Sequence, residues 1–114
     1  MSFNITDTNI TLTNGYSLDF EYPIKEAKLI NDIIIIVLAI PINVINNQNV
    51  FAITTTGDFL WRISETPPFG TSTDCPYVGI IVNKDDELAL INFCSTGVIV
   101  NALTGDIIRK YQIW

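Results

Sequence analysis

The sequence predicts a single all-β domain spanning 1–114, and three observations carry this prediction. First, Ile, Val, Thr, Phe and Tyr dominate a 114-residue chain that is 48% hydrophobic and 16% charged, and β-branched and aromatic side chains favour strands. Second, turn residues recur every few positions, and no stretch keeps a helical apolar period over the length of a helix. Third, the triplet Thr-Gly-Asp occurs at 56–58 and again at 104–106, which indicates a repeated turn.

Residues 1–24 predict an N-terminal hairpin. The segments "NITLT" and "YSLDFEY" alternate apolar and polar residues, and Asn14-Gly15 lies between them. Asn-Gly is a strong hairpin signal because a type I′ turn needs positive φ at both central positions. Pro23 is expected to end the second strand, since proline cannot donate to a strand ladder.

Two repeats of four strands are expected next, at 26–65 and 77–114. The first reads "AKLI", "IIIIVLAI", "VFAITT" and "FLWRIS", and the second reads "YVGIIV", "ELALINF", "VIVNAL" and "IIRKYQIW". The last two strands align without a gap when Gly57 is placed on Gly105. Four strands per repeat at this spacing indicate antiparallel meanders of the kind found in propeller blades or stacked sheets.

Two connections differ from the short turns of these repeats. The first repeat has a long connection after Ile40, "PINVINNQN". Residues 66–76, "TPPFGTSTDCP", separate the repeats and predict an irregular surface loop, because Pro, Gly, Ser and Thr cluster there. Long loops in small domains are often functional.

The segment "VFAITTTGDFLW" resembles the strand-turn-strand signature of blades in pyrroloquinoline-quinone-type and WD40-type β-propellers. The second copy departs from it, with Val100 in place of Ala and Arg109 where Trp61 stood. The resemblance implies blade-like sheets only and assigns no functional residue. Since two blades cannot close a ring, the repeats are expected either to pack as a sandwich or to form part of an oligomeric propeller.

The segment "IIIIVLAI", Ile33–Ile40, shows no alternation. Such a segment suits a strand that is buried on both faces, between sheet layers or under a neighbouring protomer. The longest apolar run, Ile33–Ile42, is about half as long as a membrane-spanning helix and contains Pro41, so no transmembrane segment is expected. The N-terminal residues lack a basic stretch followed by an apolar run, so no signal peptide is expected either.

The two cysteines, Cys75 and Cys94, are expected to be reduced and partly buried thiols in a cytoplasmic protein. Two cysteines are too few for a disulfide framework. A single bridge is the alternative if the chain is exported.

The net charge of −6 bears on the partners of the protein. A negative field repels phosphate backbones and anionic lipid surfaces, so neither nucleic acid nor a membrane is an expected partner. Another protein, and a basic one in particular, would be attracted, although an acidic composition also serves solubility.

The chain lacks the residues that most catalytic and metal sites use. It has no histidine, which removes the usual general base and the commonest metal ligand. No Gly-rich phosphate loop is present, and no metal or cofactor is expected. Asp85, Asp86 and Glu87 are interpreted as a solvated turn, and Asp58 and Asp106 as structural residues of the repeated turn.

Five aromatic residues are the candidate binding residues. Trp61, Phe69, Tyr77, Tyr111 and Trp114 lie in or near the loop between the repeats and the C-terminal strand. Exposed together, they would form an aromatic patch of the kind found in binding sites. For Trp61 the core is the favoured interpretation and binding the alternative, because it alternates with Phe59 and Ile63 on one strand face.

These observations predict a non-enzymatic protein-interaction module, and an immunity or inhibitor protein that covers a basic partner is one form of it. The alternative is a lectin-like carbohydrate-binding module that forms an oligomeric ring, with Trp61 and Trp114 as stacking residues. An enzyme is the third hypothesis, and only Asp58, Asp106 and the cluster at 85–87 speak for it.

Overall fold

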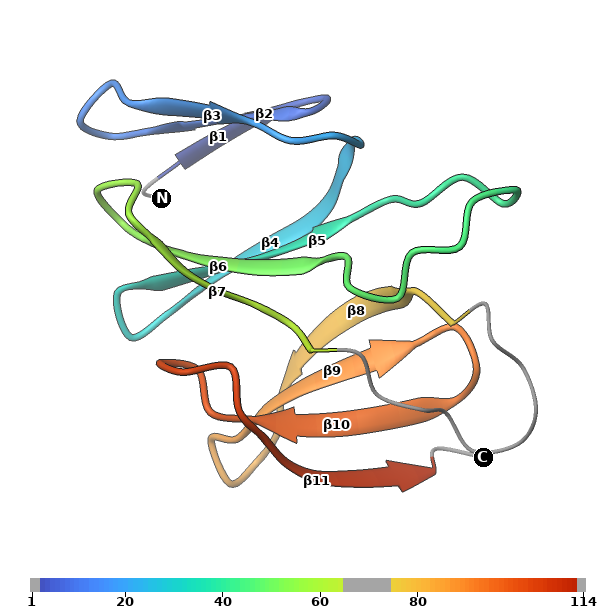
Figure 1. Cartoon of the computed structure of the whole chain (residues 1–114). Helices are drawn as coiled ribbons and strands as arrows, with labels where there is room; N and C mark the ends of the chain where they lie inside the picture. Colours follow the sequence, from blue (N-terminus) through green and yellow to red (C-terminus); the bar gives the residue numbers. More distant parts are fainter. Residues whose placement is uncertain (1–2, 65–74, 113–114) are drawn as a thin grey trace.

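The computed structural model describes residues 3–64 and 75–112, and within these ranges the protein has eleven strands and no helix (Figure 1). The N-terminal sheet contains β1 (Phe3–Thr6), β2 (Asn9–Leu12) and β3 (Ser17–Asp19). The middle sheet contains β4 (Ile24–Ile30), β5 (Ile33–Leu38), β6 (Val50–Thr54) and β7 (Phe59–Arg62). The C-terminal sheet contains β8 (Tyr77–Val82), β9 (Leu88–Asn92), β10 (Thr96–Val100) and β11 (Ile107–Gln112).

All three sheets are antiparallel, and in each of them neighbours in sequence are neighbours in space. The all-β prediction and the two four-stranded meanders are therefore confirmed. The described part of the chain contains no helix that could cross a membrane.

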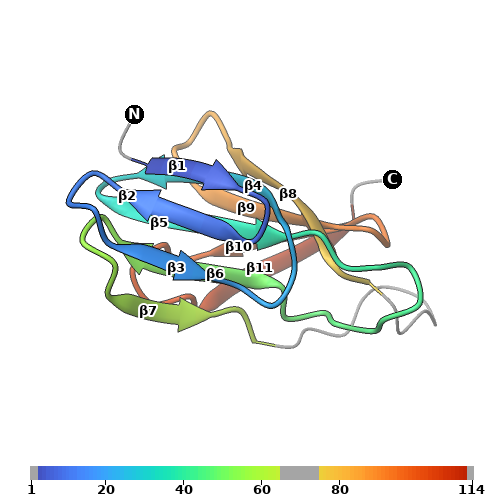
Figure 2. The same cartoon turned by 90° about the horizontal axis from the view of Figure 1, so that it is seen from above.

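The sheets are stacked face to face, with the middle sheet between the other two (Figure 1, Figure 2). Strand β5 shows why the stack forms, because its side chains alternate between two cores and all six are buried. Ile34, Ile36 and Leu38 pack with the N-terminal sheet. Ile33, Ile35 and Val37 pack with the C-terminal sheet. The prediction of a strand buried on both faces between sheet layers is confirmed.

The N-terminal segment is a three-stranded sheet, so the prediction of a simple hairpin was incomplete. Asn14 and Gly15 lie in the turn between β2 and β3, but only Gly15 has a positive φ, of 86°, so the expected type I′ turn is wrong. The amide of Leu12 donates to the carbonyl of Tyr16, so the turn encloses three residues. Strand β1 was missed. It joins β2 through a tight turn in which Asp7 has a φ of 53°, and this turn has neither the glycine nor the proline that usually marks one in sequence.

The two repeats differ by one residue in the turn before their last strand. In the middle sheet the amide of Thr54 donates to the carbonyl of Asp58, whereas in the C-terminal sheet the amide of Asn101 donates to the carbonyl of Asp106. The second turn therefore encloses one residue more. The ungapped alignment is wrong for the strand before the turn, where the repeats match only after a shift of one residue.

This extra residue decides which way the side chains of β10 point, because a one-residue slip moves every side chain to the other face of a sheet. With the shift, Val98 and Val100 correspond to Phe51 and Ile53. Phe51 and Ile53 pack toward the N-terminal sheet, and Val98 and Val100 pack toward the middle sheet. Each repeat therefore turns the same face toward the sheet that precedes it, as successive layers of one stack do.

An aromatic side chain of the N-terminal sheet, and another of the middle sheet, packs against the glycine in the last turn of the sheet that follows it. Gly57 and Gly105 have φ of 102° and 78°. A Cβ on Gly57 would overlap the ring of Tyr16, and a Cβ on Gly105 would lie 2.5 Å from the ring of Trp61. Trp61 also donates from Nε1 to the carbonyl of Ala102 over 2.8 Å. The repeated turn thus serves as the joint between layers.

The edge strands β4 and β8 are joined by side chains. The amide of Ile80 donates to Glu26 Oε1 at 3.1 Å, and its carbonyl accepts from Lys28 Nζ at 3.3 Å. These bonds satisfy backbone groups that an open sheet edge would leave to solvent. They also tie the middle and C-terminal sheets together along one side.

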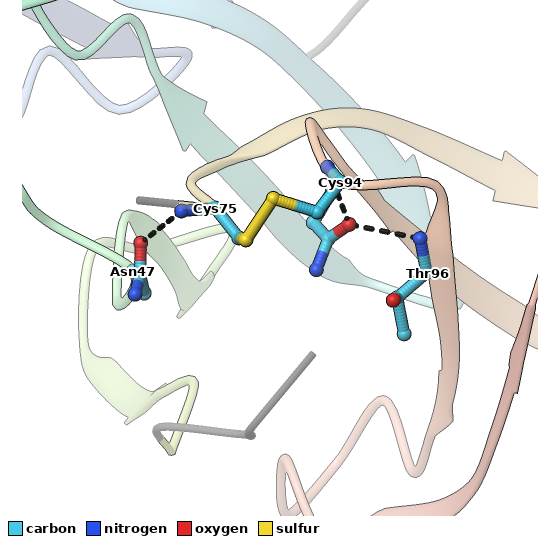
Figure 3. Close-up of a disulfide and its surroundings, with 5 residues drawn as sticks. Asn47, Cys75, Cys94 and Thr96 are labelled. Atoms are coloured by element: carbon cyan, nitrogen blue, oxygen red, sulfur yellow. Dashed lines mark hydrogen bonds between the residues drawn. A yellow bond between two sulfur atoms is a disulfide. The ribbon is translucent and has the colours of Figure 1, made fainter. Parts of the chain in front are cut away.

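Cys75 and Cys94 form a disulfide between the start of β8 and the β9–β10 turn, with their Cα atoms 5.3 Å apart (Figure 3). The prediction of two reduced thiols is therefore wrong, and the alternative of a single bridge holds. The cysteines meet because β8 and β9 pair, which their spacing in sequence does not reveal. Asn47 Oδ1 accepts from the amide of Cys75 at 2.8 Å, and Asn92 Oδ1 accepts from the amides of Cys94 and Thr96 at 2.9 Å.

Candidate functional site

Hairpin turns of all three sheets lie at one end of the stack (Figure 1). Four of these turns, in the middle and C-terminal sheets, carry exposed aspartates: Asp32, Asp58, Asp85, Asp86 and Asp106. We call this surface the acidic end. Neither of the ion pairs found among residues 3–64 and 75–112 involves any of the five. Of the five, Asp85 interacts electrostatically with Arg109, and the exposed Lys84 lies beside Asp85 in the same turn.

The acidic end is hollowed and partly apolar. A cavity of about 280 Å³ lies between the β4–β5, β8–β9 and β10–β11 turns, and its lining includes Asn31, Asp86 and Ile108. Large apolar side chains are exposed nearby: Phe59 is 64% exposed, Leu103 64% and Ile108 59%. Apolar side chains interspersed with charges are typical of protein interfaces, where the apolar part supplies binding energy and the charges supply specificity.

The arginine at this end is already paired. Arg109 donates to the Glu87 carboxylate through both terminal nitrogens, at 2.6 and 2.9 Å. This pair of hydrogen bonds, helped by a bond from Asn83 at 3.1 Å, lowers the pKa of Glu87 to about 2. Arg109 is therefore engaged mainly by Glu87.

Asp58 and Asp106 have the structural roles expected from the repeated turn. Thr56 Oγ1 donates to Asp58 at 3.3 Å, and Thr104 Oγ1 donates to Asp106 at 3.0 Å. The amide of Asp106 donates back to Thr104 Oγ1 at 3.2 Å. Among the described residues no three carboxylates or thiols converge as metal ligands. The arrangement can present charge to a partner, but it does not assemble a metal centre there.

The candidate aromatic residues do not form one patch among the residues that the structure describes. Trp61 and Tyr77 are 5% and 3% exposed and belong to the core between the middle and C-terminal sheets. Tyr111 is 37% exposed and lies over Gly97. Phe69 and Trp114 lie outside the described residues.

The profile of a domain of unknown function, DUF7957, matches residues 1–111. The chain belongs to the DUF7957 family. The match extends from before β1 into β11, so the DUF7957 domain comprises the whole stack of three sheets. No curated protein and no solved structure gives a significant match to the chain.

The surface residues of this DUF7957 domain that sequence reasoning missed lie at both ends of the stack. At the acidic end they are the exposed apolar residues Phe59, Leu103 and Ile108. At the opposite end Ile42 is 97% exposed and Phe93 is 72% exposed beside an apolar pocket. The long connection after Ile40 was the available signal for Ile42, whereas Phe93 lies in the β9–β10 turn.

Proposed function

We propose that the protein is a non-enzymatic interaction module that binds a basic protein partner through the acidic end. The observation that carries the proposal is the gathering of five exposed aspartates on four hairpin turns beside a hollow with apolar residues. Such a surface attracts a basic partner over a distance and offers apolar contacts once the partner has docked.

The residue inventory supports a binding role over a catalytic one. The chain has no histidine, and the aspartates of the repeated turn are engaged in turn hydrogen bonds. An inhibitor or immunity protein needs only shape and charge to block a basic surface, such as one that itself binds nucleic acid. That role fits an acidic scaffold held rigid by three stacked sheets.

The carbohydrate-binding alternative receives less support. Trp61, one of its two stacking residues, is buried and hydrogen-bonded to Ala102, so its ring does not offer a face to a sugar. Nothing in the described residues favours that alternative over a protein partner.

The disulfide bears on where the protein acts. Disulfides persist in oxidising compartments and are rare in the cytosol. We therefore favour an exported or otherwise oxidising location over the cytoplasmic one that the cysteine count predicted. Thiol labelling of the protein isolated under alkylating conditions tests this, because a cytoplasmic protein would be labelled at Cys75 and Cys94.

A charge reversal tests the proposed function. The immobilised chain is used to capture partners from an extract of the cells that produce it, and the captured protein is identified and titrated. Asp85→Lys is expected to weaken binding roughly tenfold, because it places a like charge against a basic partner. Added salt is expected to weaken binding of the unmodified protein as well, since exposed charges are screened.

Glu21→Lys is the matched control. It makes the same change of charge between β3 and β4, on an exposed residue away from the acidic end. Equal losses from both reversals, or capture of no stable partner by the unmodified chain, would contradict the proposal.

A further inference from the structure

An apolar pocket of about 280 Å³ lies at the end of the stack opposite the acidic end. Strands β5 and β9 begin at the acidic turns and end beside this pocket. Its walls come from the end of β5 and the connection that follows it, from the start of β8, and from the β9–β10 turn. The residues used below are Lys25, Leu38, Tyr77, Val78 and Phe93.

Two facing edge strands carry a β-bulge at this pocket. The pairing register shifts at Lys25 in β4 and at Val78 in β8, so each is an extra residue in its strand, and both line the pocket. Bulges turn a side chain out of its regular alternation and are common next to binding sites. Beyond the bulges the same strands are joined at Ile80, whose amide and carbonyl bond Glu26 and Lys28.

Lys25 supplies the only charge among the described residues that line the pocket. It is exposed, and neither ion pair within residues 3–64 and 75–112 includes it. A single ammonium at the mouth of an apolar pocket is complementary to a carboxylate on an apolar body. The charged ends form a charge-assisted hydrogen bond while the apolar part leaves water.

The pocket is held in shape by a buried asparagine and by the disulfide. Asn49 Nδ2 donates to the carbonyls of Leu38 and Tyr77, each at 2.8 Å, and its Oδ1 accepts from the amide of Tyr77 at 2.8 Å. Leu38 in β5 and Tyr77 in β8 both line the pocket. The Cys75–Cys94 bridge ties the start of β8 to the turn that carries Phe93. A site that is formed before the ligand arrives loses less entropy on binding.

From these observations we propose that the pocket binds a small carboxylic acid with an apolar body, such as a medium-chain fatty acid. The carboxylate pairs with Lys25, and the chain lies between the walls formed by Leu38, Tyr77 and Phe93. This site is separate from the acidic end, and the two could be occupied together.

Isothermal titration with octanoate tests the proposal, with octanamide as the uncharged probe of the same length. Lys25→Gln is expected to weaken octanoate binding by at least about tenfold, because it removes a hydrogen bond between charged groups. Lys84→Gln, which removes the same charge at the acidic end, is expected to leave octanoate binding unchanged. Octanamide is expected to bind the unmodified protein more weakly and to be insensitive to Lys25→Gln.

A second variant probes the apolar wall without disturbing the core. Phe93 is 72% exposed, so Phe93→Ala is expected to leave the fold intact and to weaken octanoate binding severalfold. Octanoate is also expected to shift the backbone amide resonances of Tyr77 and Val78. Equal effects of Lys25→Gln and Lys84→Gln, shifts confined to other parts of the chain, or no octanoate binding would overturn the proposal. None of these changes alters an aspartate of the acidic end, so the outcome is independent of the proposed function.

Discussion

Gly105 combines two requirements that no other residue type meets. Its φ of 78° lies in the left-handed region, and the ring of Trp61 occupies the place of its missing Cβ. Gly105→Ala is expected to lower the free energy of unfolding by about 3 kcal/mol, because a positive φ costs an L-residue about 1–2 kcal/mol and the new methyl group must also displace the indole. Urea unfolding followed by circular dichroism measures this change.

Gly15→Ala separates the two effects. Gly15 has a φ of 86°, but nothing lies within 4 Å of the position that a Cβ would occupy. Gly15→Ala is therefore expected to lower the free energy of unfolding only by the cost of the positive φ, about 1 kcal/mol. Equal losses of stability from Gly105→Ala and Gly15→Ala would show that the packing of Trp61 against Gly105 does not stabilise the contact between the sheets.

Glu87 links stability to pH. Its pKa falls from the ordinary 4.5 to about 2 because Arg109 and Asn83 donate hydrogen bonds to the ionised carboxylate. A carboxyl whose pKa is lower in the folded state stabilises the fold above its unfolded pKa and loses that contribution as pH falls through its folded pKa. Glu87→Gln is therefore expected to lower the urea midpoint slightly near neutral pH, and its difference from the unmodified protein is expected to vanish as pH falls from about 4.5 to about 2. The effect is small because both side chains are partly exposed, and a difference that stays constant with pH would contradict the assignment.

Among the elements, those with a continuous local signal were predictable from the sequence. Strand β5 was predictable because all of its residues are apolar, and only a strand between two sheet layers buries both of its faces. The β2–β3 hairpin was also predictable, because Asn14-Gly15 marks the place of the turn, although only Gly15 takes the positive φ that a type I′ turn needs at both positions. Strand β1 was not, because its turn at Asp7 uses an aspartate with positive φ. The register between repeats was misread because Thr-Gly-Asp matches in both copies and conceals the extra residue in the second turn.

Asn49 shows how one polar side chain joins two sheets. It is fully buried, and its amide bonds both the end of β5 and the start of β8. Asn49→Ala is expected to cost about 2–4 kcal/mol, because it leaves the buried backbone groups of Leu38 and Tyr77 without these partners. Asn43→Ala, on an exposed residue of the same connection, is expected to change stability by less than about 0.5 kcal/mol. Thermal unfolding of both variants makes the comparison. An equal loss of stability in Asn43→Ala would show that the effect comes from the connection as a whole and not from the hydrogen bonds of Asn49.

At the scale of the whole molecule, the sequence revealed the layers but not the two ends of the stack. The acidic end forms because aspartates from turns far apart in sequence come to one side. The apolar pocket forms because two bulges, at Lys25 and Val78, face each other across the sheets. Composition showed that the net charge is negative, but only the topology shows where on the surface the aspartates gather. Composition likewise showed that aromatic residues are present, but only the topology shows that Trp61 and Tyr77 lie in the core.

The three sheets are expected to unfold together. The middle sheet contributes side chains to both hydrophobic cores, so unfolding of either outer sheet exposes one apolar face of the middle sheet to water. The disulfide lies at one edge of the C-terminal sheet and closes a short loop between residues 19 apart. Its reduction is expected to lower the global stability by about 3 kcal/mol. Hydrogen exchange then reports the whole stack: the amides of Ile10 in β2, Ile35 in β5 and Leu90 in β9 are expected to lose the same protection on reduction. Loss of protection in β9 with none in β2 would mean that the N-terminal sheet and the middle sheet hold together without the third layer.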